Sequence, residues 1–89
     1  MGKAVERNEE VVASIRKQAG FALRDVNYRV KMGTSLFVGA RELADSSARR
    51  IVLGGRAYGM NKDEISQCIA GFRHMISPEV VQELGIKNA

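Results

Sequence analysis

The residues of this chain best suited to a specific chemical task are polar and lie close together, between Asn61 and Gln67. A Gln side chain can pair with N6 and N7 of adenine, and a Lys can bind guanine or phosphate. Gln67 and Lys62 supply these two groups, and Asn61 and Ser66 lie on the same predicted helix. These residue types at this spacing predict contacts with the edges of DNA bases.

Four arginines near this stretch are suited to the DNA backbone instead. Three precede it and one follows it: Arg49, Arg50, Arg56 and Arg73. Guanidinium groups that bind phosphate hold a protein in place on the duplex without reading its sequence. We therefore expect these arginines to position the chain and not to select the site.

The charge of the chain is distributed unevenly. Residues 16–62 carry a net charge of +7, whereas residues 1–15 carry −1 and residues 63–89 carry −2, for a total of +4. A basic block beside a candidate base-reading helix is the electrostatic pattern of a phosphate-binding surface. Acids at the start of that helix, Asp63 and Glu64, oppose this trend.

No residue pattern predicts catalysis. His74 has no Cys or Ser nucleophile in a recognisable arrangement, and the glycine-rich stretch 54–59 lacks the Lys-Ser/Thr of a phosphate loop. One Cys and one His cannot build a zinc site in a single subunit, and Cys68 is best explained as a small buried hydrophobe. We expect neither enzymatic activity nor a cofactor.

A helix-turn-helix over about residues 47–75 would position the polar residues. Such a unit needs a small residue where the helices touch and a residue that tolerates positive φ in the turn, and Gly55 and Gly59 meet these needs. Asn61 can cap the second helix, with Glu64 as its partner in a capping box. The apolar places of the unit are filled by Tyr58, Met60, Ile65 and Cys68.

The pattern as a whole predicts an all-α fold of five helices and no strand, in one domain spanning residues 1–89. Ser46 or Ser47 is expected to cap the third helix, and Ser77-Pro78 is a strong start signal for the fifth. Gly85 should end it. The expected helices are Val5–Lys31, Leu36–Ala44, Ala48–Tyr58, Lys62–Met75 and Pro78–Leu84.

The first expected helix is too long for a domain of this size to cover, and this favours a dimer. It has one continuous apolar seam at spacings of three and four residues. Residues off the seam, such as Phe21 and Val30, give it a second face that also needs burial. The predicted oligomer interface comprises Val12, Ile15, Ala19, Ala22, Val26, Leu36 and Phe37.

The sequence has no apolar run near the ~20 residues of a transmembrane helix and no signal-peptide core. We therefore expect a protein of the cytoplasm that does not act at a membrane. Nothing in the sequence predicts a small-molecule substrate.

Residues 34–55, TSLFVGARELADSSARRIVLGG, resemble the FlhD family, the small subunit of the bacterial flagellar master activator. Three further stretches are similar to elements of that family, and these are 24–27, RDVN, 59–65, GMNKDEI, and 77–84, SPEVVQEL. The spacings before Gly59 and before Pro78 are longer than in the family. A divergent relative, an activator subunit for transfer genes of conjugative plasmids or integrative elements, therefore fits better than a flagellar one.

The resemblance implies an all-α dimeric subunit of a transcription activator. It implies a larger, zinc-containing FlhC-like partner that makes much of the DNA contact, and RNA polymerase as a further partner. Two alternatives stay open from the residues alone. One is a stand-alone homodimeric helix-turn-helix repressor of a plasmid or phage, and the other is a helical inhibitor or interaction protein that does not bind DNA.

Overall fold

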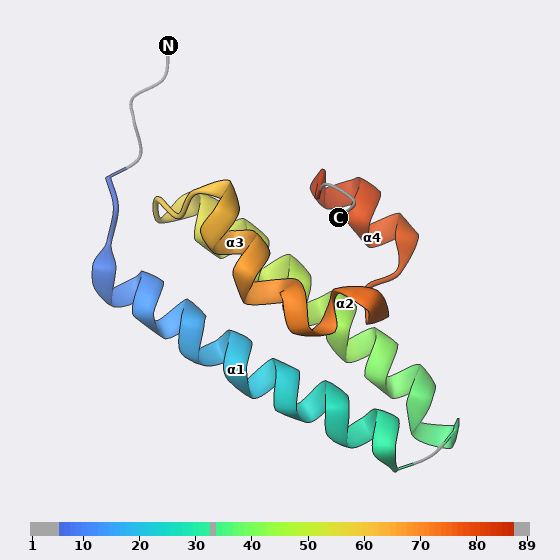
Figure 1. The fold of residues 1–89 in the computed structure, drawn as a ribbon. Coiled ribbons are helices and arrows are strands. Elements are labelled where there is room, and N and C mark those ends of the chain that lie inside the picture. Colours follow the sequence, from blue (N-terminus) through green and yellow to red (C-terminus); the bar gives the residue numbers. More distant parts are fainter. Residues whose placement is uncertain (1–5, 33, 87–89) are drawn as a thin grey trace.

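The computed structural model describes residues 6–32 and 34–86, apart from the side chains of residues 34–38. It contains α1 (Glu9–Lys31), α2 (Thr34–Ala57), α3 (Lys62–Ile69), the 3₁₀ helix η1 (Ala70–Met75) and α4 (Pro78–Leu84) (Figure 1). This part of the chain has no strand, so the predicted all-α class is confirmed. It has four α-helices where the sequence predicted five.

Helix α1 begins at Glu9 and not at Val5. Asn8 is its N-cap, and the Asn8 Oδ1 atom accepts a hydrogen bond of 3.1 Å from the backbone N–H of Val11. The backbone N–H of Asn8 itself donates to the carbonyl of Tyr58 at 3.1 Å. Because Asn8 is extended and bonded to a distant turn, the helix cannot continue through it.

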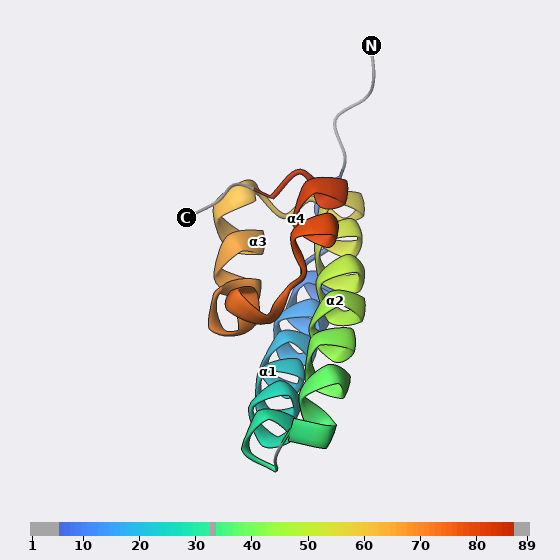
Figure 2. The ribbon, with the colours of Figure 1, turned by 90° about the vertical axis from the view of Figure 1, so that its right-hand side faces the viewer.

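Helices α1 and α2 form a long antiparallel pair, and this pair contains much of the core (Figures 1 and 2). The seam of α1 packs against a row of small residues on α2. Alanine at these places allows the two helices to approach closely along their length. The buried apolar residues of this pair are Val12, Ile15, Ala19, Ala22 and Val26 on α1 and Ala40, Ala44, Ala48, Ile51 and Val52 on α2.

Helix α2 is continuous from Thr34 to Ala57, so the predicted break before Ala48 is wrong. Ser47 does not cap a helix; it is buried, with 3% of its surface exposed, in the interior of α2. The apolar face of α2 runs through this point without interruption and packs on α1. Tertiary packing therefore overrides the local preference of serine for helix ends.

Helix α3 runs back beside the C-terminal half of α2 in the opposite direction (Figures 1 and 2). The buried residues Ile65, Ile69 and Phe72 continue along one side of α3 and η1. A contact face of this length aligns α3 along its neighbours.

The predicted helix from Lys62 to Met75 is divided into two parts. The α-helical part ends at Ile69, and the chain continues as the 3₁₀ helix η1. Gly71 in η1 lies so close to α1 that an added Cβ atom would be 2.7 Å from Cδ1 of Leu23. This segment therefore packs closely against α1 at Leu23.

Helix α4 begins and ends where the sequence predicted. Pro78 occupies its first turn, and Gly85 ends it with a φ of 64°, in the left-handed region. Ser77 is the N-cap residue, but its side chain makes no capping hydrogen bond. None of the described helices is long and apolar enough to cross a membrane.

Candidate nucleic-acid interface

The start of α3 has the predicted capping box. The Asn61 Oδ1 atom accepts a hydrogen bond of 2.9 Å from the backbone N–H of Glu64, and Glu64 Oε1 accepts one of 2.9 Å from the N–H of Asn61. Both bonds satisfy N–H groups that a helix start leaves without partners. The prediction for this pair is confirmed.

The Glu64 carboxylate also binds two arginines of the N-terminal region. Arg7 donates to both carboxylate oxygens at 2.7 Å, and Arg16 donates to Oε2 at 2.8 Å. The Arg7 hydrogen bonds, together with the one from the Asn61 backbone, lower the pKa of Glu64 from 4.5 to about 2. Glu64 therefore stays ionised in the pH range of the cell, with two guanidinium groups beside its charge.

Gly59 lets the N-terminal segment reach the turn between α2 and α3. Its φ is 92°, as predicted, and an added Cβ atom would be 2.7 Å from the Cα of Arg7. Gly55 lies close to α3 in a similar way, because a Cβ atom added to Gly55 would be 2.9 Å from Cγ1 of Ile65. The turn thus brings residues 7–8, the end of α2 and the start of α3 together.

Asn61, Lys62, Ser66 and Gln67 are all exposed, as a base-reading role requires. They do not form one row. Lys62 and Ser66 border a hollow that is also lined by Arg56. Gln67 borders a different hollow, between α3 and α1.

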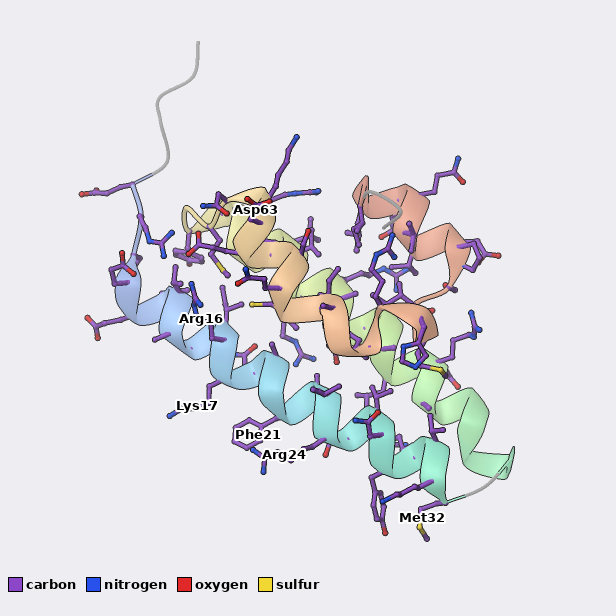
Figure 3. The ribbon with its side chains drawn as sticks, in the orientation of Figure 1. Arg16, Lys17, Phe21, Arg24, Met32 and Asp63 are labelled. Atoms are coloured by element: carbon purple, nitrogen blue, oxygen red, sulfur yellow. The ribbon has the colours of Figure 1, made fainter. Side chains whose placement is uncertain are left out.

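Asp63 also lies at the exposed start of α3 (Figure 3). A carboxylate there repels phosphate, and among the described residues no arginine or lysine pairs with Asp63 as Arg7 and Arg16 pair with Glu64. The electrostatics of the helix start are therefore mixed.

The arginines predicted to hold phosphate have different environments. Arg49 binds the Glu83 carboxylate of α4 with hydrogen bonds of 2.9 and 3.0 Å, an interaction that raises the pKa of Arg49 and lowers that of Glu83. Arg56 donates to the carbonyl of Leu84 at 2.6 Å. Arg50 is exposed, and Arg73 is half-buried. Two of the four therefore help to attach α4 to α2.

The α1 residues predicted to form an oligomer interface are covered within the chain. Val12, Ile15, Ala19, Ala22 and Val26 are each at most 8% exposed, because α2 and the segments after it pack on them. A second subunit is thus not needed to bury this seam. Of the remaining predicted residues, Leu36 and Phe37, the side chains lie outside the described part of the structure.

The one cysteine and the one histidine of the chain lie in different environments. Cys68 is half-buried, and burial raises the pKa of its thiol, which disfavours the reactive thiolate. His74 lies exposed at the end of η1. The described residues contain no group of three or more His, Cys, Asp or Glu that could hold a metal ion.

Sequence reasoning missed Arg7 and Arg16 as partners of Glu64. Both are distant from it along the chain, so no local spacing could reveal the contact. Phe21 and Val30, which the sequence placed on a second apolar face of α1, are exposed. Figure 3 shows Lys17, Phe21 and Arg24 on the side of α1 that points away from the other helices.

No protein-family model, curated protein or solved structure matches this chain.

Proposed function

We propose that this chain is an FlhD-like, DNA-binding subunit of a transcription activator. It acts in the cytoplasm with a larger, zinc-containing FlhC-like subunit and RNA polymerase. Together they switch on flagellar genes or, more in keeping with the sequence spacing, conjugative-transfer genes. The resemblance of residues 34–55 and 59–65 to the FlhD family supports this proposal.

One structural observation carries the DNA-binding part of the proposal. Arg7 and Arg16 surround the Glu64 carboxylate at the start of α3, where it would otherwise repel phosphate. Lys62 remains exposed at the same end of the helix, and Gln67 is exposed near its other end. The N-terminal turn of α3 can therefore approach a phosphate backbone more closely than its own sequence suggests.

The same structure supports dependence on a partner. Arg49 and Arg56 are engaged with α4, and the Asp63 carboxylate is exposed beside Lys62. These contacts reduce the number of cations near α3 that can bind phosphate. Because each phosphate contact adds to the affinity and to its salt dependence, fewer contacts mean weaker binding. The chain alone should bind DNA weakly, and the larger subunit should supply the missing contacts.

The test is to express the chain with the products of its neighbouring genes and to purify the complex. Binding is followed by fluorescence anisotropy with labelled DNA from upstream of those genes, over a series of salt concentrations. Lys62→Glu should weaken the complex and reduce the slope of log K against log salt by about 1. Gln67→Ala should relax the preference for specific over random DNA.

Arg29→Glu is the control, because it makes the same charge change on α1, at the end remote from the start of α3. It should alter binding less than Lys62→Glu does. Equal binding by Lys62→Glu, Gln67→Ala and the unmodified complex would remove α3 from the DNA interface.

A second function is favoured by the exposed apolar side chains of α1. Phe21 and Tyr28 of α1 are 53% and 61% exposed, and Met32, the C-cap residue, is 54% exposed. A contiguous exposed apolar patch is typical of interaction surfaces. A helical interaction protein that binds no DNA would have such a surface. It would show no salt-dependent DNA binding, either alone or with its partner.

A further inference from the structure

The hollow that Lys62 and Ser66 border lies between the end of α2, the start of α3 and the residues that follow α4. Its volume is about 180 Å³. Helix α4 packs on α2 and has no close backbone contact with α3, so the two helices leave a space between them. Ile86, which follows the last turn of α4, lines this space and is half-buried there.

The inner wall of the hollow is apolar. Val52 of α2 and Ile65 of α3 line it and are 0% and 7% exposed, and Ile86 adds a third aliphatic side chain. An apolar cavity of about 150 Å³ is large enough to hold a benzene molecule. The hollow therefore has room for an aliphatic group of about four to six carbon atoms, and removing such a group from water is favourable.

The mouth of the hollow carries charges of both signs. Lys62, Asp63 and Ser66 of α3 line it and are exposed. Within the described part of the chain, the side chains of these three residues take part in no hydrogen bond or ion pair. Arg56 of α2 also lines the hollow, and its guanidinium has N–H donors beyond the one that binds the carbonyl of Leu84. Two cations, one carboxylate and one hydroxyl can thus meet a ligand here.

We propose that this hollow binds an α-amino acid with an aliphatic side chain. Lys62 and Arg56 bind the α-carboxylate of the ligand, Asp63 accepts hydrogen bonds from its α-ammonium group, and its side chain lies against the apolar inner wall. A ligand with a carboxylate alone would leave Asp63 beside a like charge, and an amine alone would face two cations, so the mouth selects a zwitterion. This inference goes beyond the proposed function, because the binding requires neither DNA nor a partner subunit.

Lys62 belongs both to this hollow and to the proposed DNA interface. A carboxylate bound to Lys62 competes with phosphate for the same ammonium group, so the amino acid should weaken DNA binding by the complex with the larger subunit. Only this consequence rests on the proposed function. An amino acid that binds the hollow and leaves the DNA affinity unchanged would count against the DNA interface, while the ligand site would stand.

The test is an NMR titration of the isotope-labelled full chain, without DNA, with L-leucine and two analogues. Isocaproate is leucine without its ammonium group, and isopentylamine is leucine without its carboxylate. We expect leucine to shift the amide signals of Lys62, Ser66 and Ile86 until the site is saturated. Leucine should bind more tightly than either analogue by about threefold or more, the range of an exposed ion pair.

Two isosteric variants separate the charges of the ligand. Asp63→Asn should weaken the binding of leucine by about threefold or more and should not weaken that of isocaproate, because it removes only the partner of the ammonium group. Lys62→Met should weaken the binding of both. Neither residue belongs to the capping box of Asn61 and Glu64, so the start of α3 is kept.

A third variant blocks the hollow itself. Ser66→Leu places a large side chain at its mouth and should abolish leucine binding. Gln67→Leu is the matched control, because it adds the same side chain at the next residue of α3, which borders a different hollow. It should bind leucine as the unmodified chain does. Circular dichroism establishes that the variants remain helical.

The absence of saturable shifts with leucine in the unmodified chain would overturn the proposal. So would an analogue that binds as tightly as leucine, or an Asp63→Asn variant that keeps the full affinity for leucine. Equal leucine binding by Ser66→Leu and Gln67→Leu would place the ligand outside this hollow and would also overturn it.

Discussion

Arg7 and Glu64 are joined by two parallel hydrogen bonds of 2.7 Å across 57 positions of sequence. The pair attaches the segment before α1 to the first turn of α3. It is a bidentate guanidinium–carboxylate pair, in which each of two Arg7 nitrogens donates to a different carboxylate oxygen. Arg16 adds a third hydrogen bond to the same carboxylate.

Acid should release this attachment. The pKa of Glu64 in the folded chain is about 2, below its ordinary value of 4.5, so the unfolded chain binds the proton more readily. The stabilisation is therefore complete above pH 4.5 and is lost as the pH falls toward 2. Urea unfolding at pH values from about 6 to about 2 should show that the free energy of unfolding falls as the pH is lowered. Glu64→Gln should make this fall shallower.

Glu79→Gln is the control for this experiment, because Glu79 is an exposed carboxylate in the first turn of α4. It should leave most of the pH dependence in place. A Glu64→Gln variant with the same pH profile as the unmodified chain would show that Glu64 is not held by Arg7 in solution.

Gly59→Val should destabilise the chain by about 2 kcal/mol or more, because a β-branched residue tolerates positive φ poorly. The added side chain would also collide with the backbone of Arg7. Gly20→Ala is the contrasting change. Gly20 lies within α1 with nothing within 4 Å of an added Cβ, so alanine should stabilise by about 0.5–1 kcal/mol. Thermal unfolding would measure both, and equal effects would contradict the geometry of the turn.

Val12→Asp should unfold the chain itself and not merely separate subunits. Val12 is 2% exposed in the interface between α1 and α2, and an unpaired carboxylate there should cost about 3 kcal/mol or more. Phe21→Asp, on the outer face of the same helix, should keep its helical content. Circular dichroism distinguishes the two, and a fully helical Val12→Asp variant would contradict the packing of this seam.

The sequence predicted the features of this fold that depend on neighbours in the chain. Asn61 and Glu64 are three residues apart, so their spacing alone predicted the capping box. The positive φ of Gly59 was likewise predicted from its residue type and its place in a turn. The contact of Arg7 with Glu64 depends on how α1 meets α3, and no spacing encodes it.

Two features of the fold depend on tertiary packing. Ser47 favours a helix end when considered alone, but its position on the buried face of α2 decides its conformation. The sequence identified the seam of α1 as a contact face, and α2 of the same chain covers this seam. In both cases the decision lies in tertiary packing, which a pattern on one helix cannot specify.

The last prediction concerns Asp45, which attaches the start of α4 to α2. Its Oδ1 atom accepts a hydrogen bond of 2.7 Å from the backbone N–H of Ser77, and its Oδ2 atom accepts one of 2.8 Å from the Ser77 hydroxyl. Asp45 thus holds Ser77, the N-cap residue of α4, in place. Asp45→Ala should cost about 1–3 kcal/mol, because it leaves a partly buried N–H and hydroxyl without their charged acceptor.

Ser77→Ala removes one of these two hydrogen bonds and should cost less, about 1 kcal/mol. Glu42→Ala provides the control, because Glu42 is an exposed acid on α2 and its loss should be nearly neutral. Chemical denaturation of the three variants gives the comparison. If Asp45→Ala were no more destabilising than Glu42→Ala, α4 would have to be held by Arg49, Arg56 and its apolar contacts alone, and Asp45 would not fix its start.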